Sequence, residues 1–444
     1  MRKVTLMLVA LTFWAGAVGA AQLDLRECLG RAAATNRGLK TASYDIAIAQ
    51  QQIGIARSGR LPRVDLQAGY VAQLEPQAVQ FGAIQQETQD PRFPFLNLAI
   101  YNTLYDFGKT GAREGAARMQ RDAASHAYSG SEQDLFLQVV QAYYGILEAE
   151  KLVTAANDEV VQMTSHQNTA QALYDEGVVT RNDLLQAEVR VANSRQKLYS
   201  ALNGVNNGWL LLNYLIGAPP GFRGDLQEDA QMTGLPAAQA LAGTGAAVGT
   251  GATRGAGPET GSETELDLSR RGEISALKDV VAADDYAVRE AKSNYYPELF
   301  AKLALDYAKN SKVREQTMMA ATLGVKVNLF DGFATSARLR QAVQARSRDE
   351  ERLRDLEERV KLELATAQND LKVAAARIEV AQKAIAQGVE NLRITRDRYQ
   401  EKVGTATEVV DAQTLLTQTR TDYYRSIFDY QVAAARVKRG TGDL

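Results

Sequence analysis

The sequence predicts a mainly α-helical protein with four β-strands, and three observations support this fold class. First, the chain repeats itself: Tyr174 recurs as Tyr399 and Gly217 as Gly442, an offset of about 225 residues. Second, each copy holds a stretch of roughly 65 residues without proline, which is typical of a long helix. Third, each copy holds two short segments in which apolar and polar residues alternate, as in strands with one apolar face.

The first copy contains an insertion upstream of its long helix. The offset between the copies is about 235 residues there rather than about 225, so the first copy carries about ten additional residues. An insertion of this length inside a paired element would destroy its register. We therefore expect the additional residues to form a loop.

The amino terminus has the pattern of a secretory signal peptide. Arg2 and Lys3 precede an apolar run over residues 4–18, and small side chains follow at 18–20. A membrane anchor is the alternative, but the run is short for a spanning helix and ends in small residues. We predict a signal peptide over residues 1–20 and an exported chain, whose single cysteine excludes an internal disulfide.

Four segments alternate between apolar and polar residues as amphipathic strands do. Each has the length that a tilted strand needs to cross a membrane. They are residues 64–74, 95–105, 299–307 and 322–329. Half-buried strands of a soluble sandwich are the alternative. The membrane interpretation is favoured because each copy has only two such segments and is otherwise helical.

A membrane barrel built from these strands would have to be shared between chains. After the leader no apolar stretch reaches eighteen residues, so passage through a membrane would require strands. Four strands are too few to close a barrel, for which about eight are the practical minimum. An open sheet edge in lipid would leave backbone groups unpaired, at several kcal/mol each.

Two long helices are predicted over residues 109–173 and 334–398, each about 100 Å long. In the second, apolar residues recur at three- and four-residue steps from Leu353 to Leu392, which is the pattern of coiled-coil packing. A solvated amphipathic rod is the alternative, and bundle packing is favoured because the stripe is long. A glycine-containing turn and a second helix follow each rod, so both copies are predicted to be helical hairpins.

The predicted organisation is two repeats joined by a linker. Pro219 and Pro220 end the first repeat, and a stretch rich in Gly, Ala and Thr over 242–263 is typical of a loosely packed linker. The predicted units are the signal peptide 1–20, the first repeat 21–220, the linker 221–268 and the second repeat 269–444. The first repeat is predicted to contain a β-hairpin at about 62–106 and a helical hairpin at about 109–217. The second is predicted to contain a β-hairpin at about 297–331 and a helical hairpin at about 334–440.

With these features the chain resembles the TolC-type outer-membrane efflux protein family over essentially the whole mature sequence. The resemblance rests on the duplication, the proline before each first strand, the Leu-Tyr/Phe-Asp sequence that closes each strand pair, and the tyrosine and acid shared by both hairpin tips. It implies that three chains form a twelve-stranded outer-membrane barrel, continued by a tunnel of helices across the periplasm. It also implies the function of a passive exit duct in a tripartite efflux or type I secretion system.

The resemblance further implies the partners of such a duct. These are two more copies of the chain in a homotrimer, outer-membrane lipid, a periplasmic adaptor (membrane fusion) protein, and an inner-membrane efflux pump or ABC transporter. The transporter would supply the energy. Drugs, metals and secreted polypeptides all fit a generic duct as cargo, and the sequence does not choose between them.

Carboxylates near the second hairpin tip are the gate residues that the resemblance implies. Glu408 and Asp411 lie three residues apart and so share one helix face. In a trimer they would form two rings of negative charge that attract cations. The alternative is that they are first-turn acids favouring a helix N-terminus. Asp183 is the first-copy counterpart of Glu408, whereas Gln186 replaces the second acid.

The hairpin tips are the predicted contact with the adaptor. The residues concerned are Tyr174, Gly177, Val179, Thr180, Tyr399, Val403, Gly404 and Thr405. The second tip departs from the family pattern, because Lys402 stands where a glycine is common and Ala406 where some members have an arginine that latches the closed tip. The sequence therefore does not predict a latch of that particular kind.

Other function classes find little support. The formal net charge of −2 gives no basis for a nucleic-acid partner. The two histidines, His126 and His166, are isolated, and no nucleophile elbow, phosphate loop or Cys/His cluster occurs, so we expect no catalytic site, metal or cofactor. A periplasmic coiled-coil adaptor or scaffold without a pore is the rival hypothesis. It explains the rods and the leader but gives the four alternating segments no role.

Overall fold

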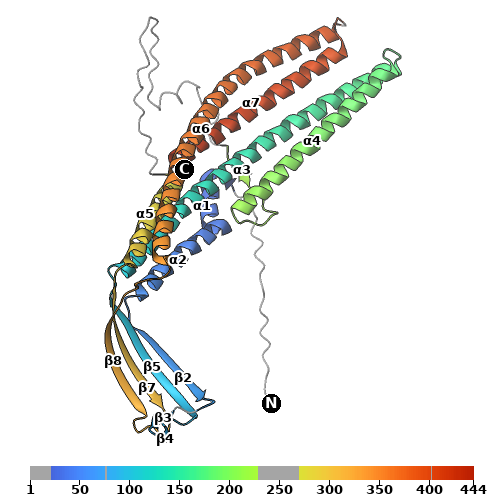
Figure 1. Cartoon of the computed structure of the whole chain (residues 1–444). Helices are drawn as coiled ribbons and strands as arrows, with labels where there is room; N and C mark the ends of the chain where they lie inside the picture. The colour runs from blue at the N-terminus through green and yellow to red at the C-terminus, as the bar shows by residue number, and fades with distance from the viewer. Residues whose placement is uncertain (1–21, 76–77, 229–269, 402) are drawn as a thin grey trace, which may run out of the picture.

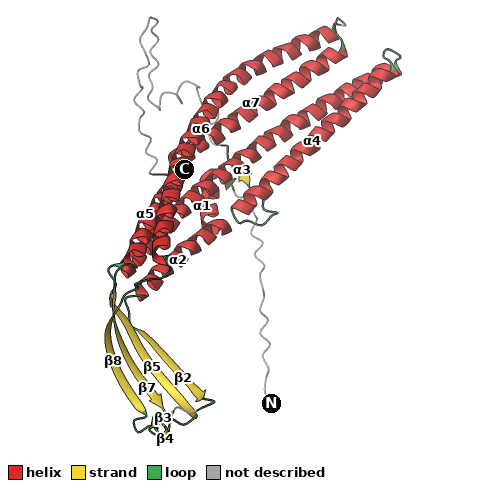
Figure 2. Cartoon of the chain, viewed as in Figure 1, coloured by secondary structure: helices red, strands yellow, loops and turns green. Residues whose placement is uncertain are grey.

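The computed structural model describes residues 22–75, 78–228, 270–401 and 403–444. The predicted signal peptide over 1–20 and most of the predicted linker over 221–268 lie outside these residues. The described part is an elongated molecule in which long helices continue from a four-stranded sheet at one end (Figure 1). Coloured by secondary structure, it separates into a helical rod and a β-sheet with short connections between them (Figure 2).

Four long helices form two hairpins, as predicted. The first consists of α3 (Lys109–Asp175) and α4 (Arg181–Leu215), and the second of α6 (Ala334–Gln400) and α7 (Ala406–Thr441). The helices α3 and α6 each have 67 residues, so each is about 100 Å long. The four helices lie side by side in the order α6, α7, α3, α4, so α6 and α4 form the two edges of this layer (Figure 1).

Three shorter helices pack on the part of this layer that is nearer the sheet (Figure 1). They are α1 (Leu25–Thr35), α2 (Arg37–Ser58) and α5 (Gly272–Ser293). Helix α2 packs against α3 and leads into the sheet, while α5 lies between α3 and α6 and leads into the second pair of strands. The repeats therefore enter the sheet in the same manner, each through a short helix and a proline, Pro62 or Pro297.

The four predicted strands form one antiparallel sheet in the order β2-β5-β7-β8. Their bounds are Arg63–Ala72, Arg92–Tyr105, Glu298–Ala308 and Thr317–Lys326. The last strand was predicted over 322–329 but spans Thr317–Lys326, so both its start and its end are corrected toward the N-terminus. Its pairing with β7 ends at the Glu298–Lys326 pair, because Pro297 has no N–H to continue the ladder.

The sheet has one apolar face and one polar face, as the alternation predicts. Leu66, Leu98, Leu305 and Met319 are in register across all four strands, so one row of the apolar face runs from edge to edge. On the opposite face, Asn97 donates a hydrogen bond to Asp306, and the hydroxyl groups of Tyr101 and Thr103 donate to Glu298 over 3.1 and 2.9 Å. Polar groups thus bond to each other on one face and leave the other apolar.

The additional residues of the first copy contain a small hairpin that the sequence did not predict. Its strands are β3 (Ala78–Phe81) and β4 (Ile84–Glu87), which pair only with each other. In the chain they come between β2 and β5, and they lie at the end of the sheet far from the helices (Figure 1). The expectation of a plain loop was therefore wrong, but the insertion does lie outside the register of the main sheet. Two-residue strands β1 (Gln22–Leu23) and β6 (Asp225–Leu226) also pair, and are too short for a sequence pattern.

The main hydrophobic core lies at the middle of the rod, where α1 meets α3 and α4. It contains Val139, Tyr143 and Ile146 of α3 and Trp209 and Leu212 of α4. The hydroxyl of Tyr143 donates to the backbone oxygen atoms of Leu23 and Gln227, at 3.1 and 2.7 Å. The pairing of β1 with β6 is thereby fixed to the helical layer.

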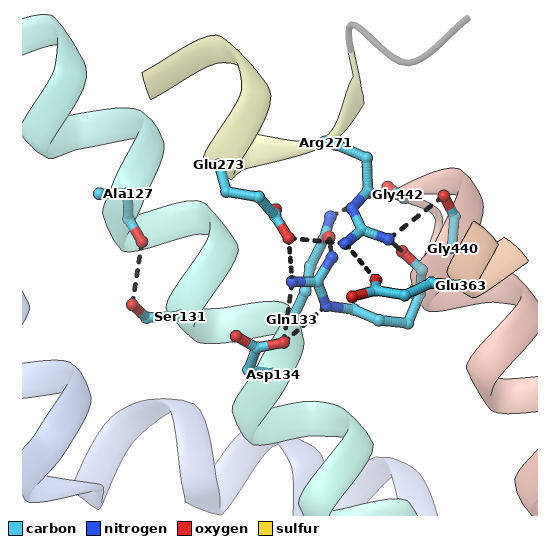
Figure 3. A network of polar contacts seen from close by, with 10 residues as sticks. Ala127, Ser131, Gln133, Asp134, Arg271, Glu273, Glu363, Gly440 and Gly442 are labelled. Atoms are coloured by element: carbon cyan, nitrogen blue, oxygen red, sulfur yellow. Dashed lines mark hydrogen bonds and ion pairs between the residues drawn. The ribbon is translucent and has the colours of Figure 1, made fainter. Parts of the chain in front are cut away.

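A buried charge network joins the start of α5 to the end of α7 and the middle of α3 (Figure 3). Arg271, which is almost fully buried, donates to Glu273 over 2.6 Å and to the backbone oxygen of Arg439 over 3.1 Å. Arg439 also contacts Asp134, at 2.8 Å. Gly272 packs so closely on α3 that a Cβ there would lie 2.5 Å from the backbone nitrogen of Gly130. The second repeat is thus joined to the first at this point.

Candidate gate at the hairpin tips

Helices α3 and α6 each begin three residues after the aspartate of the Leu-Tyr/Phe-Asp sequence. A carboxylate oxygen of Asp106 accepts from the backbone N–H of Thr110 over 2.7 Å, and Asp331 accepts from that of Thr335 over 2.9 Å. Negative charge at this position stabilises a helix N-terminus. The motif therefore marks the junction between sheet and rod in both repeats.

Exposed aromatic side chains surround this junction. The ring of Phe107 stacks on Tyr296, with centroids 5.3 Å apart, and contacts Tyr105 edge-on. In the second repeat, Phe330 and Phe333 are both exposed and contact each other. Aromatic residues are enriched where a membrane protein meets the lipid–water boundary. The sheet together with these aromatic side chains has the form of a membrane-embedded segment whose boundary with water lies at the junction with the helices.

At the first tip, backbone geometry depends on glycine. Gly177 has φ 74, which places it in the left-handed region. The chain then turns so that Val178 N–H donates to the oxygen of Leu173 over 2.8 Å. Thr180 caps α4, because its hydroxyl accepts from Asp183 N–H while the Asp183 carboxylate accepts from Thr180 N–H. The hydroxyl and N–H of Thr180 lower the pKa of Asp183, so this acid is charged and fixed at the helix start.

The turn at the second tip has a different pattern of backbone hydrogen bonds. The N–H groups of Val403 and Gly404 both donate to the backbone oxygen of Arg398, over 2.9 and 3.1 Å. Thr405 caps α7, since its hydroxyl accepts from Glu408 N–H over 3.3 Å. Residue 402 lies outside the described residues. The caps Thr180 and Thr405 occupy equivalent positions in the two repeats.

The structure divides the predicted tip residues into two groups. Val403 points into solvent and is 72% exposed, and its first-copy counterpart Val178 is 67% exposed. Val179, Tyr399 and Thr405 instead line a cavity between the two hairpins. Val179 was predicted as a contact residue and Val178 was not, although the offset of about 225 residues pairs Val178 with Val403.

The two predicted gate acids are each paired with an arginine. Glu408 lies 3.4 Å from Arg398 across its own hairpin tip. Asp411 lies 3.6 Å from Arg190, which belongs to the other hairpin. Asp183 is not part of either pair and is held by Thr180 instead. The two acids are therefore one turn apart on α7, and their arginines come from different elements.

The hairpins meet next to Asp411. Met163 of α3, Val191 of α4 and Val410 of α7 form a small buried cluster. Beside it lies the cavity of about 360 Å³ into which His166, Asp183 and Arg190 also project. Burial, and then the charge of Arg190, lower the pKa of His166. The junction thus combines apolar contact with a few charged groups of opposite sign.

Neither a metal centre nor a spanning helix emerges from the described residues. In that part of the chain, no group of three or more His, Cys, Asp or Glu side chains is arranged to hold a metal ion. Over the same residues, none of the helices combines the length and apolarity that crossing a membrane demands.

The fold and its amphipathic sheet define a class of protein, the membrane channel with a long helical extension, and comparison with known proteins identifies the family. The family model for outer membrane efflux proteins matches residues 28–218 and 265–443. The chain therefore belongs to the outer membrane efflux protein family. It is an outer-membrane efflux channel with a periplasmic helical extension, and its family and fold are those of channel proteins.

Individual relatives are distant but cover most of the chain. Protein CyaE of Bordetella pertussis is 24% identical over 88% of this chain and 78% of its own length. The alkaline protease secretion protein AprF of Pseudomonas aeruginosa is 22% identical over 78% of this chain and 69% of its own length. Outer membrane protein TolC of Vibrio cholerae is 21% identical over 95% and 91%.

Solved structures share the fold. The structure of CusC, described in terms of transmembrane channel formation, superposes with a TM-score of 0.77 at 16% identity, over 95% of this chain and 93% of that one. The outer-membrane channel OprN gives a TM-score of 0.76 at 18% identity, over 95% and 90%. VceC of Vibrio cholerae gives 0.74 at 16% identity, over 94% and 96%.

Proposed function

We propose that three copies of this chain form a passive exit duct across the outer membrane and the periplasm. The observation that carries the proposal is the continuity of one chain from an amphipathic four-stranded sheet into helices about 100 Å long (Figure 1). Strands of this length suit a membrane, and rods of this length suit the aqueous space beneath it. An inner-membrane efflux pump or ABC transporter, acting through a periplasmic adaptor, would open the duct and supply the energy.

The sheet supports a shared barrel because both of its edges are free in the single chain. Within the described part of the chain, the edge strands are β2 and β8, and each has only one neighbour. In lipid, their unpaired backbone groups would cost several kcal/mol each. Pairing β2 of one copy with β8 of the next removes both edges, and three copies give the twelve strands that the family resemblance implies.

The helical layer supports the same arrangement. Its edge helix α4 carries an exposed apolar stripe formed by Leu185, Val189, Tyr199, Leu210 and Tyr214. Its other edge helix, α6, carries a second exposed stripe formed by Leu362, Val373, Val380 and Ile394. Two different apolar edges favour a head-to-tail interface, and such an interface forms a ring when the rotation between successive copies closes. Packing α4 against α6 of the next copy would bury both stripes and close a tunnel.

The gate proposal places Glu408 and Asp411 at the narrow end of this tunnel. In a trimer each would form a ring of three carboxylates, which favours cations at a constriction. Asp183 adds a further fixed negative charge at the first tip. The salt bridges of Glu408 and Asp411 with Arg398 and Arg190 support a closed conformation in which the acids are partly compensated.

The tips are the proposed docking site for the adaptor. Val178 and Val403 offer two equivalent apolar side chains per copy, hence six around a trimer. The glycines Gly177 and Gly404 and the caps Thr180 and Thr405 shape the turns that present them. Tyr174 is also exposed at the first tip, whereas Tyr399 faces the cavity.

The nature of the cargo follows from the transporter rather than from this chain. One relative is named for the secretion of an alkaline protease, and BepC of Brucella suis is named an efflux protein. Both a polypeptide and a small molecule therefore fit the proposal. No cofactor and no catalytic step are invoked.

A scaffold without a pore is the competing function, and the location of the assembled protein separates the two. Membranes from cells that express the chain should be extracted in mild detergent and analysed by chemical cross-linking. The duct requires a trimer that fractionates with the outer membrane. A soluble monomer or dimer in the periplasm would contradict it.

A further inference from the structure

We propose that Arg190 sets the ion preference of the channel by compensating the charge of Asp411 from the neighbouring hairpin. This inference rests on the proposed function, because it assigns a role to a residue at the same gate. Arg190 was not among the residues that the sequence pointed to. Its position between the two hairpins, next to Asp411, is visible only in the structure.

The position of Arg190 is fixed by the helix to which it belongs. It lies seven residues after Asp183 and four after Gln186 on α4, so all three share one face of that helix. This face looks onto the cavity between the hairpins, which all three residues line. From there the Nη1 atom of Arg190 reaches to 3.6 Å from Oδ1 of Asp411 on α7.

The ion pair borders a buried apolar contact. Val191, the next residue on α4, and Val410, the residue before Asp411, are both buried in the cluster with Met163. Arg190 and Val410 also line a second cavity, of about 560 Å³, on the other side of the contact. The two charges are therefore held near each other by the apolar packing of their neighbours.

The other charged groups at this junction are already engaged. Lys197 lies 2.8 Å from Glu159, Asp183 accepts hydrogen bonds from Thr180, and Glu408 lies 3.4 Å from Arg398. Among the described residues, Asp411 is the only acid within ion-pair distance of Arg190. His166 also lines this cavity, and its lowered pKa keeps it neutral near pH 7.

The two repeats differ in a complementary way at these positions. Gln186 and Arg190 of the first copy correspond to Asp411 and Leu415 of the second, at an offset of 225. Each copy thus carries one charge of the pair and an uncharged residue at the other position. A negative charge occurs in one repeat and the positive charge that faces it occurs in the other.

Stability does not account for this arrangement. The side chains of Arg190 and Asp411 are 35% and 69% exposed, and ion pairs this exposed contribute little to folding. The charge itself is the more important property, because a ring of three carboxylates at a constriction attracts cations and a ring of three neutral pairs does not. Arg190 therefore limits the contribution of Asp411 to the negative charge of the gate while the hairpins are in contact.

Reversal potentials in planar bilayers under a KCl gradient test this assignment. The proteins to compare are the wild type, Arg190→Gln, Asp411→Asn, the charge swap Arg190→Asp with Asp411→Arg, and the control Arg195→Gln. Arg195 is exposed on the same helix, away from the face that carries Asp183 and Arg190. We expect Arg190→Gln to raise the K⁺/Cl⁻ permeability ratio by about threefold or more. Asp411→Asn should lower it by a similar factor, and the swap should return it to the wild-type value.

The outcomes separate this inference from the function on which it rests. Suppose that the wild-type protein conducts but Arg190→Gln leaves the reversal potential unchanged, or shifts it only as much as Arg195→Gln does. Either result overturns the role of Arg190 and leaves the duct intact. A swap variant that fails to restore the ratio overturns the pairing with Asp411. The absence of any current from inserted wild-type protein overturns the duct, and the role of Arg190 with it.

Discussion

One carboxylate oxygen of Glu273 accepts hydrogen bonds from two arginines, Arg271 at 2.6 Å and Arg439 at 2.8 Å. Arg271 begins the second repeat and Arg439 ends it, so a single acid joins both ends of that repeat (Figure 3). Asp134 extends the contact to α3 of the first repeat. The relative position of the two hairpins therefore depends on a compact charge network near the middle of the rod.

This network predicts a specific dependence of stability on pH. Burial alone would raise the pKa of Glu273, but the hydrogen bonds from Arg271 and Arg439 lower it to about 2. Because the folded-state pKa lies below the unfolded value, the contribution to stability is complete above about pH 4.5 and is lost as the pH falls toward 2. A shift of this size corresponds to about 3 kcal/mol.

The substitution Glu273→Gln should remove this contribution. It removes the acid that the two buried arginines share and leaves each with a single, more exposed acid, Glu363 for Arg271 and Asp134 for Arg439. A loss of up to roughly 3 kcal/mol is expected. Thermal unfolding in detergent at pH 7 measures it. Glu379→Gln is the control, because Glu379 forms an exposed pair with Lys383, and it should change stability by less than about 0.5 kcal/mol. Equal effects of the two substitutions would show that the network does not hold the repeats.

Burial of His166 predicts a second dependence of stability on pH, at higher pH values than that of Glu273. Burial and the charge of Arg190 lower its pKa, so the folded protein takes up a proton less readily than the unfolded chain does. Stability is therefore highest above about pH 6.5 and decreases as the pH falls below it. His166→Gln should reduce the difference in melting temperature between pH 7.5 and pH 5.5. If His126→Gln has the same effect as His166→Gln, the explanation is wrong.

The first tip should be sensitive to loss of its glycine. Gly177→Ala places a Cβ on a residue with φ 74, at a cost of roughly 1–2 kcal/mol from backbone strain. No neighbouring atom lies within 4 Å of that Cβ, so a steric clash does not contribute. Gly145→Ala, in the middle of α3 and equally free of contacts, should instead stabilise by about 0.5–1 kcal/mol. Proteolysis at the tip and thermal unfolding report the difference.

The exposed valines at the tips should matter for the partner and not for the pore. Val178→Asp combined with Val403→Asp puts charge on both apolar tips and should abolish cross-linking to the adaptor and export from cells. Single-channel conductance should stay at the wild-type value, because both side chains point away from the cavity between the hairpins. Export at the wild-type rate would place the adaptor contact elsewhere.

The exposed stripe on α6 should control assembly. Val380→Glu introduces a charge at a face that the proposed trimer buries, at a cost of about 2 kcal/mol or more per interface. Native mass spectrometry in detergent should then show mainly monomers. Gln382→Glu, two residues further along the same helix on its opposite side and exposed, should leave the oligomer unchanged. A trimer that persists with Val380→Glu would argue against the α4–α6 contact.

The sequence predicts the long-range organisation better than the details of contact. The repeat, the apolar alternation and the absence of proline are properties of many residues together, so the hairpins and the four strands could be predicted. The hairpin of β3 and β4 could not, because four-residue strands are too short for their periodicity to stand out. The start of β8 was misplaced, because Met318 interrupts the alternation there.

The site was predictable in part for the same reason. Glu408, Asp411 and the two threonine caps stand in a local pattern that both tips repeat. Arg190 has no such pattern, because its partner is more than 200 residues away and its second-copy counterpart is a leucine. Arg271 and Glu273 were missed because a charged pair at a helix start is expected to be exposed, whereas Arg271 is buried here in contact with α6 and α7.

Single-channel conductance in a planar bilayer tests the central claim most directly. The wild-type protein should be compared with the double variant Glu408→Ala and Asp411→Ala. A duct closed by these acids predicts a small, cation-preferring current that becomes larger and loses its cation preference in the double variant. No current from either protein after verified insertion would contradict the duct, and a current that the substitutions leave unchanged would contradict the gate.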